Sequence, residues 1–391
     1  MGEMMRVHCL NNISKYGLQL LSNKYEITKD FYESELILVR SAVMHEMETP
    51  KELIAVGRAG AGVNNIPLDK YAKEGIVVFN TPGANANGVK ELVLAGMLMS
   101  VRDIHGGINW VKNNASDPEI AKTVEKAKAQ FGGTEILGKS IGIVGLGAIG
   151  ILVANACHSL GMSVYGYDVY FTEERRHLLP VDFTFCDSLE DLYAVSDFVT
   201  LHVPLTPDTK GMINEQTLSN MKDGVVILNY SRDSLVDDDA IEKAINSKKV
   251  RKYVTDFPNP RTANMDGVIC IPHLGASTEE SEDNCAMMAV RQLMNYAETG
   301  SIVNSVNYPT CELPICESEV RLAVLHENTP TMLNILTEIV SKNPRTKIMK
   351  LVNNVKGNVA YTVYDINHDN LDDIVKEIKT QASVYRIRVI K

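Results

Sequence analysis

Short apolar runs alternate with longer segments of helical spacing over most of the chain, starting near the N-terminus. Residues 36–40, 53–56 and 76–79 each predict a buried strand. Residues 113–128 are polar and predict an exposed helix, with Trp110 just before it. Strands that alternate with helices form parallel sheets, whose ligands bind beyond the carboxyl ends of the strands. The residues at those ends are therefore the first candidates for chemistry.

The strongest pattern lies in the middle of the chain, where residues 141–144 predict a buried strand. This strand breaks into Gly145, Gly147 and Gly150, a helical pattern follows, and a second short strand ends at Asp168. A strand, a glycine-rich turn, a helix and a spaced acid together make the dinucleotide-binding fingerprint in its expected context. The alternative is a Rossmann-like fold that binds nothing.

Each part of this fingerprint has a physical role. Gly145 permits a tight turn, Gly147 lets the backbone approach a pyrophosphate, and Gly150 lets the helix sit close to the strand. The phosphates then meet the free amide groups and the positive end of the helix. Asp168 can accept hydrogen bonds from an adenosine ribose and would repel a 2′-phosphate. The fingerprint therefore predicts NAD rather than NADP.

Three later strands end in residues that suit acid–base chemistry. Arg232, Asp256 and His273 each follow a predicted strand in the second half of the chain. An arginine can pair with the carboxylate and carbonyl oxygen of an α-keto acid. A histidine can take a hydroxyl proton as hydride leaves the same carbon. A lone histidine after a proline is more often structural, so only the combination with Arg232 indicates catalysis.

The first lobe has polar strand ends of its own. Arg40 follows one predicted strand, Arg58 begins a glycine loop after the next, and Asn85 lies in a glycine- and asparagine-rich loop after the third. Two arginines beside exposed loop amides suit a small phosphorylated or carboxylated anion. The alternative is that both arginines are ordinary solvated surface charges.

Composition narrows the class of protein. With 391 residues, 45% of them hydrophobic, and no apolar run of membrane-spanning length, we expect a soluble protein of two or three domains. The formal net charge of −10, without a basic patch, argues against nucleic acid and anionic membranes as partners. Seven scattered cysteines lack zinc-site spacing, so we expect reduced thiols and no metal. The absence of a signal-peptide pattern predicts a cytoplasmic location.

Several segments carry a resemblance to a known family. The GLGAIG turn, the HVPLTPDTKGMIN and NYSRDSLVDDDAI segments and PHLGAST resemble the D-isomer-specific 2-hydroxyacid dehydrogenases. The segments VGRAGAGVNNI and FNTPGANANGVKELVLAGML resemble the members that act on 3-phospho-D-glycerate. The match covers nearly all of residues 1–310. It implies an α/β protein with two Rossmann-like parallel-sheet lobes, in which residues 1–88 with 275–308 bind substrate and residues 89–274 bind NAD.

The resemblance also implies roles for individual residues. Arg232 is expected to orient the substrate, and His273 is expected to be the catalytic acid and base. The implied cofactor-binding positions are Gly145, Gly147, Ala148, Ile149, Gly150, Asp168, His202, Val203, Pro204, Asn229, Tyr230, Asp256, His273 and Gly275. The implied substrate-binding positions are Arg40, Ser41, Arg58, Ala59, Gly60, Asn85, Arg232 and His273. The implied reaction is the NAD-dependent oxidation of 3-phospho-D-glycerate to 3-phosphohydroxypyruvate, the first step of L-serine biosynthesis.

The C-terminal part follows the βαββαβ order of the split ferredoxin-like unit. The predicted elements are strands at 320–325, 347–352, 359–366 and 384–390, with helices at 331–340 and 369–380. With the preceding lobes, residues 318–391 resemble an ACT regulatory domain, and His326 and Asn328 match the serine-sensing H-x-N motif of that family. The alternative is a dimerisation domain that senses nothing. Both predict a homo-oligomer, either a dimer or a tetramer.

Some points stay open at the level of the sequence. The family normally pairs its catalytic histidine with a glutamate, but the shorter loop here carries Asn259 near that position. We therefore expect no carboxylate partner for His273, and the alternative is that Asp256, Glu279 or Glu280 has taken over the role. Thr331 stands where a glycine usually lets an effector approach, so we expect weak or absent inhibition by serine. The alternative substrate is another D-2-hydroxy acid such as 2-hydroxyglutarate. The alternative to an enzyme is an NAD-sensing binding protein.

Overall fold

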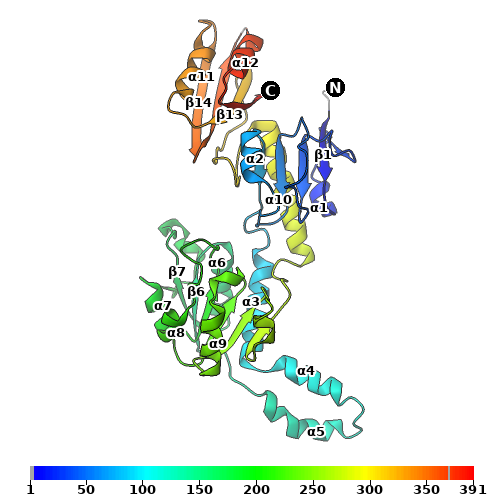
Figure 1. The fold of residues 1–391 in the computed structure, drawn as a ribbon, viewed down its shortest axis with the longest axis vertical. Helices are drawn as coiled ribbons and strands as arrows, with labels where there is room; N and C mark the ends of the chain where they lie inside the picture. The colour runs from blue at the N-terminus through cyan, green and yellow to red at the C-terminus, as the bar shows by residue number, and fades with distance from the viewer. Residues whose placement is uncertain (1–3, 369) are drawn as a thin grey trace. The chain divides into compact units, whose positions relative to one another are not determined.

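The computed structural model describes residues 4–368 and 370–391, which form two compact units (Figure 1). The first unit combines the N-terminal segment up to Ala84 with Glu282–Lys391, and the second is the single stretch Asn85–Ser281. Within these described residues, no helix is both long enough and apolar enough to cross a membrane. The three domain ranges given above remain predictions.

A parallel sheet forms the N-terminal half of the first unit. In the described part of the chain it has the order β2-β1-β3-β4-β5, with β1 (Met5–Cys9), β2 (Tyr25–Thr28), β3 (Leu36–Val39), β4 (Ala55–Arg58) and β5 (Val77–Phe79). Its helices are α1 (Lys15–Leu18), α2 (Leu68–Lys73) and α10 (Glu279–Thr299). Leu36 and Leu38 share a core with Leu293 of α10, whereas Ile37 lies in the core that contains Tyr71 of α2. Because both faces are buried, the strands are apolar throughout, as in other parallel sheets.

The C-terminal half of the first unit is a four-stranded antiparallel sheet, which confirms the predicted fold class. Among the described residues its order is β14-β15-β13-β16, with β13 (Val320–Glu327), β14 (Lys347–Lys356), β15 (Val359–Asn367) and β16 (Val384–Ile390). One face packs against α11 (Met332–Ser341) and α12 (Leu371–Lys379). The other face, with Ala323, Leu325 and Tyr361, joins the core of the N-terminal half. The predicted start of the last helix at residue 369 lies outside the described residues.

The second unit is a parallel sheet with helices on both faces. Its described strands run in the order β12-β11-β10-β9-β6-β7-β8, namely β6 (Ser140–Val144), β7 (Ser163–Tyr167), β8 (Thr184–Phe185), β9 (Phe198–Leu201), β10 (Val225–Asn229), β11 (Val250–Thr255) and β12 (Val268–Cys270). One core contains residues of α3 (Ala86–Val101) and α6 (Ala148–Ser159). The other contains residues of α7 (Leu189–Val195), α8 (Glu215–Ser219) and α9 (Asp238–Asn246). The order of strands reverses beside β6, where ligands bind in folds of this kind.

The predicted exposed helix at 113–128 was wrong in its boundaries. The chain instead forms α4 (Ile104–Asn113) and α5 (Ile120–Ala127), which project from the second unit (Figure 1). Trp110 lies inside α4, and Asn114 caps that helix by donating to the carbonyl of Trp110. Pro118 lies between the two helices, where a proline and the residue before it disfavour a continuous helix.

Candidate active site

The glycine turn between β6 and α6 has the shape that a pyrophosphate needs. Gly145 has φ of +93°, and a Cβ there would lie 2.5 Å from the carbonyl oxygen of His202. A Cβ at Gly150 would collide with the carbonyl of Gly145, whereas a Cβ at Gly147 would meet no other atom within 4 Å. Gly147 is also the N-cap of α6, and its helix has no side-chain cap. The open surface beside free helix amides therefore fits the phosphates of NAD, with Ala148, Ile149 and Gly150 in the first turn.

Asp168 is fixed beside this turn by two backbone amides. Its Oδ2 accepts from Leu146 N at 2.7 Å, and its Oδ1 accepts from Tyr170 N at 2.7 Å. Val169, the next residue, is 68% exposed. The carboxylate is thereby held at the end of β7, next to the turn, which is where the sequence analysis expects a ribose.

The neighbouring strand ends carry the other predicted cofactor residues. His202 follows β9, and its Nδ1 is buried and has no hydrogen-bond partner among the described residues, while its Nε2 lies 3.0 Å from Thr200 Oγ1. Burial lowers the pKa of His202 to about 3. The imidazole is therefore neutral at ordinary pH. Val203 packs near Gly145, so the segment from His202 to Pro204 forms one wall of the turn.

Asn229 at the end of β10 shapes the loop that carries Arg232. Its Nδ2 donates to the carbonyl of Arg232 at 2.9 Å and to the hydroxyl of Tyr253 at 3.1 Å. Its Oδ1 accepts from Ser231 N at 3.2 Å. Asn229 thus positions the arginine through the backbone. Tyr230 is buried, and desolvation raises the pKa of its phenol far above the usual range.

Phe257 lies close to both Arg232 and His273. The Phe257 and His273 rings are 4.5 Å apart, and the guanidinium of Arg232 lies 5.8 Å from the Phe257 ring centre. Sequence reasoning missed Phe257, although it directly follows Asp256 and its position after β11 was the available signal. The phenyl ring gives the two polar side chains a common apolar support.

Asp256, which directly precedes Phe257, is buried next to the cluster of Arg232, Phe257 and His273. It is 1% exposed, and its Oδ2 accepts from Gly275 N at 3.1 Å. Burial raises the pKa of the Asp256 carboxyl, against the opposing effects of the Gly275 amide and of the charges on His273 and Arg232. Through the Gly275 amide, Asp256 is attached to the loop that carries His273, and the identity of any acid that partners the histidine stays a prediction. Asn259 is turned elsewhere, because its Nδ2 donates at 3.0 Å to both Asp233 and Asp238.

The predicted anion-binding residues of the first unit form a second cluster. Arg58 Nε donates to the carbonyl of Arg40 at 3.1 Å. A Cβ at Gly60 would collide with Arg58 Nη1, and Gly60 N donates to Thr81 Oγ1 at 2.7 Å. The carboxylate of Glu282, which the sequence analysis did not single out, lies 2.7 Å from Arg40 Nη2. Only the fold brings these two together, because α10 is remote from Arg40 in sequence.

The remaining substrate candidates are distributed more widely. Ser41 is exposed and its amide donates to Asn11 Oδ1 at 3.0 Å, while Ala59 is buried next to Arg58. Asn85 belongs to the second unit, where it is the N-cap of α3 without a side-chain capping bond. Their predicted roles stay predictions.

The H-x-N residues of the C-terminal sheet are already engaged within the protein. His326 is buried, its Nδ1 donates to the carbonyl of Glu327 at 2.8 Å, and its Nε2 lies 2.7 Å from Thr362 Oγ1. Burial lowers the pKa of His326. Asn328 is exposed and donates to the carbonyl of Gly357 at 3.2 Å.

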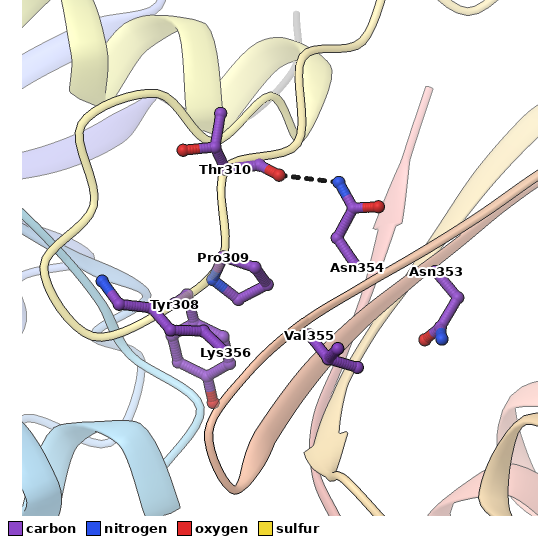
Figure 2. A pocket seen from close by; sticks show the side chains of 7 residues that line it. All are labelled: Tyr308, Pro309, Thr310, Asn353, Asn354, Val355 and Lys356. Atoms are coloured by element: carbon purple, nitrogen blue, oxygen red, sulfur yellow. Dashed lines mark hydrogen bonds between the residues drawn. The ribbon is translucent and has the colours of Figure 1, made fainter. Parts of the chain in front are cut away.

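An open hollow lies where β14 meets the segment Tyr308–Thr310. Figure 2 shows the side chains of Asn353 and Asn354 pointing to opposite sides of β14. Asn354 Nδ2 donates to the carbonyl of Thr310 at 2.6 Å, and Lys356 Nζ donates to the carbonyl of Val306 at 3.0 Å. These contacts attach the segment 306–310, the linker, to the C-terminal sheet. Asn353 Oδ1 instead accepts from Thr362 Oγ1 at 2.8 Å.

Comparisons with known proteins identify the relatives of this chain. The family model described as the NAD binding domain of D-isomer specific 2-hydroxyacid dehydrogenases matches residues 94–275. The D-3-phosphoglycerate dehydrogenase of Haemophilus influenzae is 32% identical over 357 residues, which are 88% of this chain and 83% of that protein. The enzyme of the same name from Escherichia coli K12 is 33% identical, over 87% of this chain and 82% of its own.

Solved structures share the fold. The cofactor (NAD+)-bound 3-phosphoglycerate dehydrogenase of Entamoeba histolytica superimposes with a TM-score of 0.62 at 24% identity, covering 78% of this chain and 99% of that one. A glyoxylate reductase structure reaches a TM-score of 0.62 at 23% identity, over 78% of this chain and 98% of that one. At these sequence identities the structural similarity shows the fold alone.

Proposed function

This chain belongs to the D-isomer-specific 2-hydroxyacid dehydrogenase family, and on that premise we propose that it oxidises 3-phospho-D-glycerate to 3-phosphohydroxypyruvate with NAD. The reaction is the first step of L-serine biosynthesis. The observation that carries the proposal is the cluster of Arg232, Phe257 and His273 beside buried Asp256. The relatives from Haemophilus influenzae and Escherichia coli, at 32% and 33% identity, are both named D-3-phosphoglycerate dehydrogenase.

The chemistry at carbon 2 follows from the roles of three side chains. NAD, when bound, accepts the hydride from carbon 2. His273 takes the hydroxyl proton on a ring nitrogen, so that a carbonyl can form as the hydride leaves. Arg232 pairs with the carboxylate and with the oxygen that becomes the carbonyl, which fixes the acid in one orientation. Asp256 fixes the loop that carries His273, because its Oδ2 accepts from Gly275 N at 3.1 Å.

The other end of the substrate is a phosphate, for which we propose the arginines of the first unit. Arg40 and Arg58 offer guanidinium groups that suit bidentate pairing with phosphate oxygens. Gly60 leaves the space into which the Arg58 side chain fits. Ser41, Ala59 and Asn85 are proposed to complete this subsite with loop amides and polar side chains.

A screen of D-2-hydroxy acids and their keto forms with NAD and NADP tests the proposal. The expected result is the highest kcat/KM for 3-phospho-D-glycerate with NAD. A preference for unphosphorylated acids such as 2-hydroxyglutarate would overturn the substrate assignment. Failure to turn over any of these acids would leave an NAD-sensing binding protein, and Arg232→Ala and His273→Ala serve as inactive references in either case.

We propose that the protein is a cytoplasmic homodimer or homotetramer. Strand β14 is an edge strand of the C-terminal sheet, and its Met349, Leu351 and Val355 are 59%, 41% and 52% exposed. Edge strands with exposed apolar side chains readily pair with another copy. All seven cysteines are free within the described residues, as suits a reducing compartment. Light scattering on the purified protein measures the oligomer, and a monomer at all concentrations would contradict the proposal.

We propose that L-serine inhibits this enzyme weakly or not at all. An effector that binds through His326 would have to displace Thr362, which occupies Nε2 at 2.7 Å. Thr331 precedes α11 with a side chain at the position where close approach to the helix amides is needed. Initial rates at rising serine concentration provide the test. Submillimolar inhibition that disappears in His326→Ala would refute it.

A further inference from the structure

An acidic side chain lies inside the arginine cluster of the first unit. Glu282 Oε1 is 2.7 Å from Arg40 Nη2, and the two side chains are 43% and 40% exposed. Arg40 lies just after β3, while Glu282 lies in the first turns of α10. The contact is therefore made between elements that the fold brings together, at the residues we assign to the phosphate.

The buried thiol of Cys285 reports which charges share this place. Burial is the largest effect and raises the pKa of Cys285, and a hydrogen bond to Thr81 opposes it. The positive charges of Arg58 and Arg40 also lower that pKa, and the negative charge of Glu282 raises it. Arg58 Nε donates to the carbonyl of Arg40 at 3.1 Å, and Arg40 pairs with Glu282, so two positive charges and one negative charge lie within a short distance of one another.

We propose that Glu282 determines how strongly this subsite discriminates between substrates of different charge. This inference rests on the proposed function, because it concerns the same arginines. Glu282 offsets part of the positive charge of Arg40 and Arg58, which reduces the advantage of a phosphate of charge about −2 over a carboxylate. The acid therefore weakens the preference for the phosphorylated substrate and admits D-2-hydroxy acids whose far end carries a single negative charge.

The expected size of the effect follows from Coulomb's law. Two unit charges about 4 Å apart in water change an equilibrium by about fivefold, and a doubly charged phosphate squares that factor. Removing the charge of Glu282 should thus strengthen binding of a singly charged group by about fivefold and of a doubly charged phosphate by about thirtyfold. The affinity of the phosphate relative to the carboxylate should therefore change by about fivefold. Because the site is partly exposed, salt reduces this effect.

Glu282→Gln tests the proposal, since it removes the charge and keeps nearly the same shape. The measurement is kcat/KM for 3-phospho-D-glycerate and for D-2-hydroxyglutarate, at low and at high ionic strength. We expect the ratio of the two values to rise by about fivefold in favour of the phosphorylated acid, mostly through KM, and less at high salt. An unchanged or falling ratio overturns the inference.

Glu298→Gln is the matched control. Glu298 also lies on α10 and also pairs with a cation, Lys24, at 3.1 Å. It lies at the opposite end of the helix, so the ratio should stay within about twofold of wild type. A shift equal to that of Glu282→Gln would show a general effect of net charge and would overturn the local assignment.

The assignment of 3-phospho-D-glycerate as substrate can fail independently of the role of Glu282, and the two failures give different results. If wild type oxidises only unphosphorylated acids, the assignment of 3-phospho-D-glycerate falls. Competitive inhibition by inorganic phosphate then decides the role of Glu282, and Glu282→Gln should lower the inhibition constant by about fivefold or more. An inhibition constant that does not change would show that Glu282 has no influence on anions at the arginines.

Discussion

At the scale of single residues, Asp168 is the predicted determinant of cofactor choice. Its carboxylate is held by two amides at 2.7 Å, and the exposed Val169 follows it. Asp168→Ser combined with Val169→Arg should raise the ratio of NADP to NAD use, because repulsion is removed and a partner for the 2′-phosphate is added. The gain should be about tenfold or more, as for one charge-assisted contact. Initial rates with both cofactors measure it, and wild type that already used both equally would contradict the assignment.

Gly60 is a residue whose absent side chain matters. It has φ of +143°, and a Cβ would collide with the guanidinium of Arg58. Gly60→Ala should displace that guanidinium and raise KM for a phosphorylated substrate by about ten- to a hundredfold, which corresponds to the loss of about 1.5–3 kcal/mol. The steady-state kinetics of Arg58→Ala and of the double variant Gly60→Ala with Arg58→Ala test whether Gly60 acts through the Arg58 guanidinium. If the two losses simply add, Gly60 does not act through Arg58.

At the scale of the elements, His202 makes the carboxyl end of β9 sensitive to acid. Its folded-state pKa is about 3, below the unfolded value of about 6.5, because burial disfavours the charged ring. The unfolded chain therefore takes up a proton first as the pH falls. Stability is fully present above pH 6.5 and is lost progressively between pH 6.5 and pH 3, by about 2 kcal/mol at pH 5.

His202→Asn should make the free energy of unfolding less dependent on pH in this range. Urea unfolding of both proteins at pH 7 and pH 5 provides the measurement. The variant is expected to lose about 2 kcal/mol less than wild type between these two values. Equal losses would mean that the imidazole is protonated in the folded state.

The sequence predicted those helices and strands whose positions are determined by the period of apolar residues and by glycines. The run into Gly145 and Gly150 located β6 and α6, because only glycine tolerates the close backbone contacts found there. The short strand β2 was not predicted, since only Tyr25 of its four residues is buried and no alternation of apolar and polar residues marks it. The pairing of Arg40 with Glu282 and the support of His273 by Phe257 could not be predicted, because each depends on tertiary contacts.

At the scale of the whole molecule, a buried ion pair joins the C-terminal sheet to the segment before it. Arg321 Nε and Nη2 donate to the two oxygens of Asp365 at 2.6 and 2.7 Å, and both side chains are almost completely buried. Arg321 Nη1 also donates to the carbonyls of Thr299 and Pro314 at 2.7 and 2.8 Å. The guanidinium thus links β13, β15, the end of α10 and the linker.

Asp365→Asn should destabilise the first unit by about 3–5 kcal/mol, because it leaves a buried guanidinium without its counter-ion. The double variant Arg321→Met with Asp365→Leu should recover most of that loss, since no uncompensated charge remains. Thermal unfolding of the full chain measures both. A single variant as stable as wild type would show that water or another group compensates the charge.

The interrupted first unit also determines the order of events during synthesis. Leu36 and Leu38 share a core with Ala289 and Leu293, which leave the ribosome only after all of Asn85–Ser281 has been made. The second unit is continuous in sequence and can finish folding first, as domains generally do when they are complete. The N-terminal strands must wait with one apolar face uncovered. During that interval the uncovered apolar face can bind chaperones. If synthesis stops before α10 is complete, the product has one folded unit and one sheet with an exposed apolar face.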